Sequence, residues 1–172
     1  MLAIHIILRL IHIFAGVFWA GVAFFIALVF TPATAKMGPE GGRFMQQFAQ
    51  KTQISKHMSL AALLTTVPGI ILYVIDSGFR PAWMTTGIGV GWTIGGLAGI
   101  AAFLHGGLVT GRTSNRIAQL GQEIAAAGGP PAPAQLAEMG RLQAKMREAG
   151  IVSAVLLAVA VLGMTVARYL PW

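Results

Sequence analysis

Four long runs that are almost free of charged side chains dominate the pattern of apolar and polar positions along the chain. A membrane-spanning helix needs about 20 mostly apolar residues, and each run is long enough. The alternation of apolar and polar residues that marks the strands of a membrane β-barrel is missing. The pattern therefore predicts an all-α integral membrane four-helix bundle, with spans at about 10–31, 57–76, 83–111 and 151–170.

Two polar segments join these spans on one side of the membrane. Residues 34–56 contain the breaks Gly38-Pro39 and Gly41-Gly42, followed by apolar residues at spacings that suit a short interfacial amphipathic helix. Residues 112–150 keep an apolar stripe at spacings of three and four on both sides of the breaker GGPPAP. We therefore expect a helical hairpin that extends the third and fourth spans, either as a self-packing linker or as a docking surface for a partner subunit.

The composition agrees with a single membrane domain over residues 1–172. Apolar residues make up 56% of the chain and charged residues only 10%, whereas a soluble domain carries about 25% charged residues. The chain has no cysteine, which excludes disulfides, thiolate metal sites and a cysteine nucleophile. There is also no Ser or Thr catalytic triad and no phosphate-binding Gly-Lys-Ser/Thr loop. An electron-transfer or accessory membrane protein is therefore favoured over a stand-alone enzyme.

The basic residues are unevenly divided between the two sides of the predicted bundle. Of the 12 Lys and Arg, only Arg9, Arg80 and Arg168 lie on the side of the termini. Because positively charged loops stay in the cytoplasm, we expect both termini outside a bacterial-type plasma membrane and the segments 34–56 and 112–150 inside it. The net charge of +7 then reflects orientation near anionic lipid headgroups. Basic and aromatic residues are not interleaved as in a nucleic-acid platform, so no nucleic-acid partner is expected.

The third predicted span is rich in glycine. Gly91, Gly95 and Gly99 form successive small-xxx-small steps, which allow membrane helices to approach closely. Such a face suits close helix packing, a homodimer or a larger membrane complex. It also suits a wall against which a flat macrocycle could lie.

Histidines are the main ionisable residues within the predicted spans, where such side chains point to function. From a rise of about 1.5 Å per residue, His57 and His105 lie at matching depth on the cytoplasmic side, and His12 lies roughly 25 Å away in height. Two axial ligands of one metal need ring nitrogens about 4 Å apart. His57 and His105 are therefore the predicted ligand pair, and His12 a ligand at a second, outer site. His5 shares the helical face of His12, as does Trp19, while Gly16 leaves room for a bulky neighbour.

Haem b is the natural cofactor for histidines that face each other from membrane helices without a thiolate. Copper is the alternative, because imidazole suits it and Met58 or Met45 could add a thioether. The eight methionines are scattered rather than clustered.

The segment IHIFAGVFWAGVAFFIALVFTPA, with His12, Gly16, Trp19, Gly21 and Pro32, resembles the first helix of the CopD-like and HemJ-like families of small bacterial membrane proteins. The stretch TTVPGIILY is similar to their second helix, so the resemblance covers roughly residues 1–110. It implies a helical bundle in which the first-helix histidine, His12, binds haem or copper.

The sequence is compatible with three functions. The first is a haem b-binding, cytochrome-like protein that exchanges electrons with a quinone or a partner subunit. The second is a copper-handling or transport protein. The third is a cofactor-free accessory subunit of a larger membrane complex.

Overall fold

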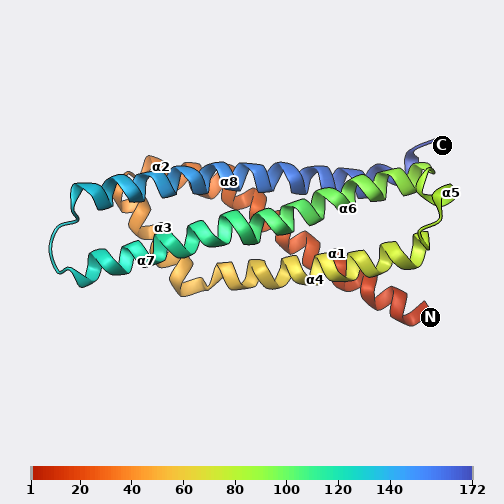
Figure 1. Cartoon of the computed structure of the whole chain (residues 1–172), viewed down its shortest axis with the longest axis horizontal. Coiled ribbons are helices and arrows are strands. Elements are labelled where there is room, and N and C mark those ends of the chain that lie inside the picture. Colours follow the sequence, from red (N-terminus) through yellow and green to blue (C-terminus); the bar gives the residue numbers. More distant parts are fainter. Residues whose placement is uncertain (1, 172) are drawn as a thin grey trace.

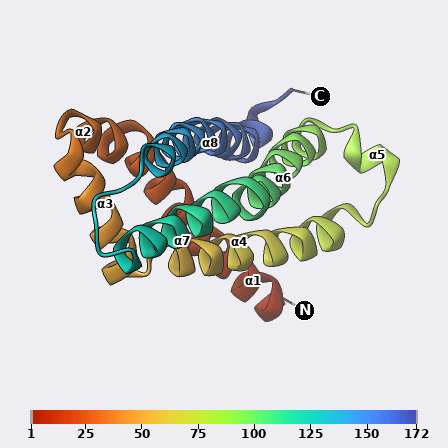
Figure 2. The same ribbon diagram turned by 60° about the vertical axis from the view of Figure 1, so that its left-hand side comes forward.

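Four long helical segments run side by side in the computed structural model, which describes residues 2–171 apart from the side chain of Pro39 (Figures 1 and 2). Met1 and Trp172, the ends of the expected single domain, lie outside the described residues. All four segments are long and apolar enough to cross a membrane, which is compatible with a multi-pass membrane protein. They consist of α1 (Leu2–Phe25), η1 (Ile26–Phe30) and α2 (Thr31–Lys36); α4 (Ile54–Ser77); α6 (Gly87–His105), η2 (Gly106–Gly111) and α7 (Arg112–Ala126); and α8 (Pro133–Val166) with η3 (Ala167–Tyr169).

The two short helices lie at opposite ends of the bundle. α3 (Pro39–Thr52) links the first segment to α4, and α5 (Pro81–Met84) links α4 to α6. Figure 1 shows both termini and α5 at one end, which we call the terminal end. The other end, which holds α2, α3 and the connection between α7 and α8, is called the hairpin end.

The first long segment extends well beyond the expected boundaries of 10–31. It begins at Leu2 and continues through Pro32 to Lys36, so the helix is longer than the span expected within it. The π-helical turn η1 precedes the proline. In a regular α-helix the proline ring clashes with the carbonyl four residues earlier, and the wider π turn removes that conflict.

The segment after the first span is helical over most of its length. The break at Gly38 is present, with φ of +61°, but the expected break at Gly41-Gly42 lies inside α3. A side chain at position 41 would collide with the carbonyl of Thr34, so the glycine serves close packing of α3 against α2. The amphipathic face predicted for this helix packs inward, because Phe44 and Phe48 lie against Phe30 with ring centroids 5.9 and 4.8 Å apart.

The four segments pack as two tight pairs. α1 lies against α4 and α6 against α8, with fewer contacts between the pairs. Small buried residues fill the place where all four helices meet, and they include Ala20, Ala61 and Ala102 next to Trp19 and Leu157. Small side chains allow close approach of membrane helices, which explains the absence of large aliphatic residues from most of this core.

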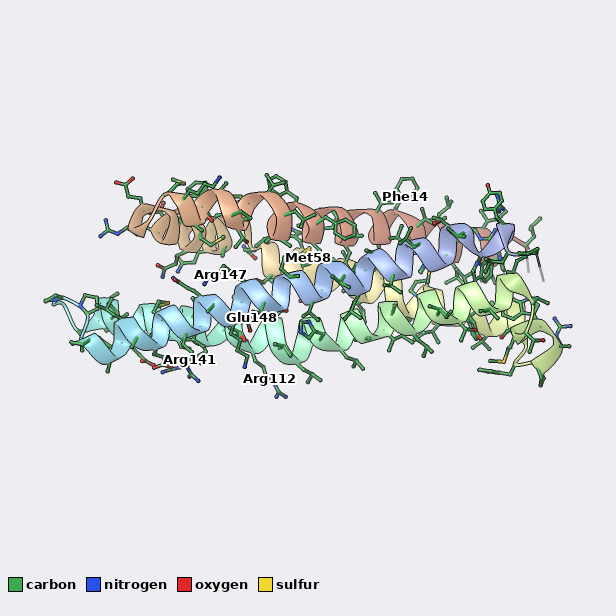
Figure 3. All side chains as sticks on the ribbon, turned by 90° about the horizontal axis from the view of Figure 1, so that it is seen from above. Phe14, Met58, Arg112, Arg141, Arg147 and Glu148 are labelled. Carbon is green, nitrogen blue, oxygen red and sulfur yellow. The ribbon has the colours of Figure 1, made fainter. Side chains whose placement is uncertain are left out.

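Large apolar side chains cover the outside of the apolar part of the bundle. Phe14 is 73% exposed and Leu97 63% exposed. Figure 3 shows Phe14 projecting outward, while Arg112 and Arg141 lie towards the hairpin end. Exposed apolar area on this scale is unusual for a soluble monomer, and it is what contact with lipid requires.

The predicted helical hairpin is present and continuous with both long helices. Leu120 of α7 and Leu142 of α8 are buried in its seam. Arg116 of α7 donates a hydrogen bond of 2.8 Å to Glu138 of α8, which joins the two helices, and one of 2.9 Å to Glu123 within α7. These bonds raise the pKa of Arg116, and the bond from Arg116 lowers the pKa of Glu138 below its ordinary value.

The lowered pKa of Glu138 makes the hairpin sensitive to acid. The ion pair contributes at pH values above the ordinary carboxyl pKa, and its contribution is lost as the pH falls through the lower value of the folded state. With exchange rates corrected for the intrinsic effect of pH on amide exchange, we expect the protection of the α7 amides to fall modestly below about pH 4, since an exposed pair is weak. Arg116→Ala should already show faster exchange at pH 7, whereas Lys145→Ala should not. Equal exchange in all three proteins would contradict the role of Arg116.

Candidate functional site

His12 is held between α1 and α4 by a hydrogen bond to the backbone. Its Nδ1 lies 2.7 Å from the carbonyl oxygen of Thr65. Because a carbonyl oxygen only accepts hydrogen bonds, Nδ1 carries the proton and the lone pair is on Nε2. A histidine that ligates a metal usually donates its other ring N–H to a carbonyl or carboxylate, which fixes the ring and its tautomer. The arrangement leaves Nε2 of His12 free to act as a ligand atom.

Two glycines make room for this arrangement. A Cβ at Gly69 would lie 2.7 Å from Cε1 and 2.8 Å from Nδ1 of His12, so the imidazole ring occupies the space of the missing side chain. One turn further along α1, a Cβ at Gly16 would lie 3.4 Å from the methyl group of Thr65. The room that the sequence suggested beside Gly16 is therefore bordered by Thr65. Pro68, which lacks an N–H, lies in the same turn of α4.

A second histidine meets a carboxylate in the same interface. Nε2 of His5 lies 3.8 Å from Oδ1 of Asp76, near the terminal end of α1 and α4. Oδ2 of Asp76 is buried and has no hydrogen-bond partner among the described residues. Sequence reasoning missed this pair because Asp76 stood at the end of a predicted span. One signal was available: His5 and His12 are separated by seven residues, as are Gly69 and Asp76 on the antiparallel helix.

In the described residues, His57 and His105, the predicted ligand pair, each have a different polar neighbour. His57 is exposed, and its Nδ1 lies 3.2 Å from the carbonyl oxygen of Gln53 at the start of its own helix. Nδ1 of His105 lies 3.1 Å from Oγ of Ser153 on α8. Each ring therefore has its Nδ1 beside a partner outside the proposed pair, and Nε2 is its remaining nitrogen.

Trp19 and the glycine face have packing roles in this structure. Trp19 is buried in the core where the four helices meet. A Cβ at Gly91 would lie 2.5 Å from Cβ of Ala167, and a Cβ at Gly95 would lie 2.9 Å from the carbonyl oxygen of Ala160. α8 therefore covers the glycine face, as expected for close helix packing.

No group of three or more His, Asp or Glu side chains in the described part of the chain is arranged to hold a metal ion. Comparison with known proteins found no matching family model, no matching curated protein and no matching solved structure. The candidate site therefore rests on geometry alone: His12 with its carbonyl partner, and His5 with Asp76 at the terminal end of the same interface.

Proposed function

We propose that this chain is a haem b-binding, cytochrome-like protein of a bacterial plasma membrane, with both termini outside. In this role it exchanges electrons with a quinone or a partner subunit. The observation that carries the proposal is the hydrogen bond from Nδ1 of His12 to the carbonyl of Thr65, which leaves Nε2 free as a ligand atom. His12 is the ligand that the geometry supports best, and His57 and His105 are further proposed ligands.

The donor set favours haem over a bare metal ion. A porphyrin supplies four ligand atoms, so the protein needs to add only one or two axial ligands. A copper ion bound by side chains alone needs a cluster of imidazole, thioether or carboxylate groups, and no group of three or more His, Asp or Glu among the described residues includes His12. When bound, haem would supply a one-electron redox centre. His12 would hold its iron, and the backbone carbonyl of Thr65 would orient the imidazole.

Absorbance and metal analysis of the full chain, purified in detergent, test the proposal. A sharp haem b band in the reduced-minus-oxidised spectrum, together with iron near one equivalent per chain or more, is the expected result. Copper at that level without a haem spectrum would replace the proposal by a copper-handling role. A colourless, metal-free protein that co-purifies with a larger complex would replace it by an accessory role.

A further inference from the structure

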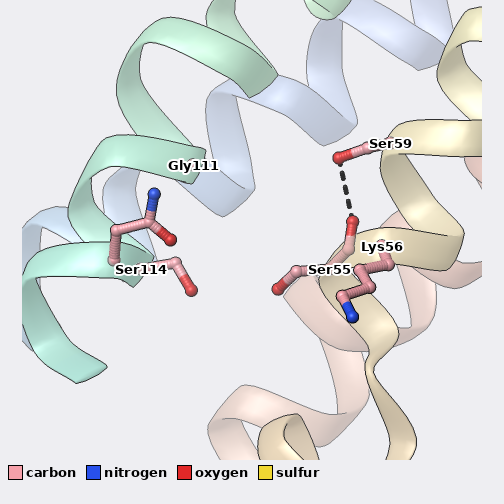
Figure 4. Close-up of a pocket in the computed structure, with 6 residues that line it drawn as sticks. Ser55, Lys56, Ser59, Gly111 and Ser114 are labelled. Carbon is pink, nitrogen blue, oxygen red and sulfur yellow. Dashed lines mark hydrogen bonds between the residues drawn. The ribbon is translucent and has the colours of Figure 1, made fainter. Parts of the chain in front are cut away.

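An open surface pocket of about 380 Å³, which we call the cavity, lies at the hairpin end, where two of the apolar helices emerge into polar sequence. One wall is the first turn and a half of α4, and the other is the junction of η2 and α7 (Figure 4). The residues that line it are Ser55, Lys56, Ser59, Gly111, Ser114 and Asn115. This cavity is separate from the His12 site, because none of the residues around His12 lines it.

The lining provides hydrogen-bond donors, and it contains no carboxylate side chain. Among the described residues, the hydroxyls of Ser55 and Ser114 make no hydrogen bond to the protein, and Figure 4 shows their oxygens facing each other across the gap. The hydroxyl of Ser59 donates to the carbonyl of Ser55 at 2.9 Å. Nζ of Lys56 donates to Oε1 of Gln53 at 3.0 Å, which leaves two further N–H groups on the ammonium.

Lys56 is the charged residue of the lining. Arg112 directly follows Gly111 in sequence and is exposed. The nearby acidic residues Glu123 and Glu138 are hydrogen-bonded to Arg116 and do not line the cavity. The wall formed by α4 is also the amino-terminal turn of that helix, where the helix dipole favours an anion. An anion that accepts several hydrogen bonds is the ligand class that this lining fits.

We propose that this cavity binds a phosphate group, and that its natural source is the headgroup of an anionic phospholipid. The position of the cavity supports that source. Apolar residues of α4 follow Ser59, and the apolar part of the third segment ends at Gly111, so the lining lies at the level where the bundle passes from hydrocarbon to headgroups. A phosphate held there would have its acyl chains beside the exposed apolar faces of the same helices. The proposal does not depend on the cofactor.

Lipid retention by the full-length protein, measured by native mass spectrometry from detergent, tests the site. The probes are phosphatidylglycerol, phosphatidylcholine as the reference, and inorganic phosphate. We expect wild-type protein to retain phosphatidylglycerol several-fold more than phosphatidylcholine. Lys56→Gln should reduce that retention about fivefold, and Ser55→Ala combined with Ser114→Ala should reduce it further. Lys51→Gln, which removes an exposed charge from α3 outside the cavity, is the matched control and should leave retention unchanged.

The phosphate probe distinguishes the two sources of the ligand. Selective retention of phosphatidylglycerol that millimolar inorganic phosphate does not displace supports the lipid headgroup. Thermal stabilisation by inorganic phosphate that is lost in Lys56→Gln, without lipid selectivity, supports the site with a soluble phosphate compound as its ligand. Equal retention of both lipids with no phosphate effect would overturn the proposal. An equal loss of phosphatidylglycerol retention in Lys51→Gln and Lys56→Gln would also overturn it, because retention would then depend only on the net charge of the protein.

Discussion

In the His12→Ala protein, we expect the haem b absorbance of the purified chain to fall by at least about tenfold relative to wild type. The substitution removes the one histidine whose Nδ1 donates to a carbonyl in the α1–α4 interface and whose Nε2 is thereby left as a lone-pair donor. The fold should survive, because the ring occupies a position beside Gly69 and is not part of the alanine-rich core. Haem content per mole of protein, measured by a pyridine haemochrome assay, checks the expectation.

Gly69→Ala tests whether the orientation of the His12 ring matters for haem binding, because the imidazole itself is retained. The added methyl group would lie under 3 Å from the His12 ring, so the ring must rotate and give up its bond to Thr65. Loss of an outer-shell partner lowers metal affinity about 10–100-fold, and we expect weaker haem binding with the imidazole still present. Gly21→Ala is the matched control, because nothing lies within 4 Å of the new Cβ. Normal haem binding in Gly69→Ala would show that the Thr65 carbonyl does not orient the ligand.

His5→Ala tests whether haem binding depends on His12 in particular and not on any histidine in the α1–α4 interface. His5 shares the interface but pairs with Asp76, so its removal should leave most of the haem spectrum in place. If His5→Ala or His57→Ala abolishes the spectrum while His12→Ala retains it, then His12 is not the ligand and the proposed assignment fails.

Gly91→Ala should produce a large loss of stability, because it adds a methyl group where α6 packs against α8 and η3. The new Cβ would lie 2.5 Å from Cβ of Ala167 and 2.8 Å from the carbonyl oxygen of Gly163. These atoms belong to or adjoin the backbone of the neighbouring helix, so α6 and α8 must separate. Overpacking of this kind costs about 1–3 kcal/mol. Equilibrium unfolding of the protein in mixed micelles measures the change in the free energy of unfolding.

Gly96→Ala is the matched control for this prediction. It lies on the same helix and adds the same methyl group, but nothing lies within 4 Å of the new Cβ. Alanine has a higher helix propensity than glycine by up to about 1 kcal/mol, so this variant should unfold at the same or higher denaturant. A similar loss of stability in both variants would show that the glycines act through helix propensity and not through the α6–α8 contact.

The helices were predictable because charge-free runs and apolar stripes depend on local sequence. The hairpin was found in this way, since the stripe that includes Leu120 and Leu142 continues past the apolar spans. The expected helix breaks differ from the structure where contacts with neighbouring segments determine the backbone geometry. Pro32 is accommodated by the π turn η1, and Gly41 lies within α3 because it packs against Thr34. Neither outcome follows from the local residue pattern alone.

The site was only partly predictable, because residue number along a helix gives depth but not direction. His57 and His105 were paired by depth, yet His57 bonds within its own helix and His105 faces α8. Direction depends on which neighbour each helix packs against. For His12 the partner is 53 residues away in sequence, and its identity requires the register of α1 against α4.

α8 runs without a break from the hairpin into the bundle. Its 34 residues extend for about 50 Å, whereas the hydrocarbon core of a bilayer is about 30 Å thick. The helix is therefore roughly 20 Å longer than that core is thick. No break separates its hairpin part from Ser153, whose hydroxyl lies 3.1 Å from Nδ1 of His105. One continuous helix thus carries both Leu142, which is buried in the hairpin seam, and the polar partner of His105.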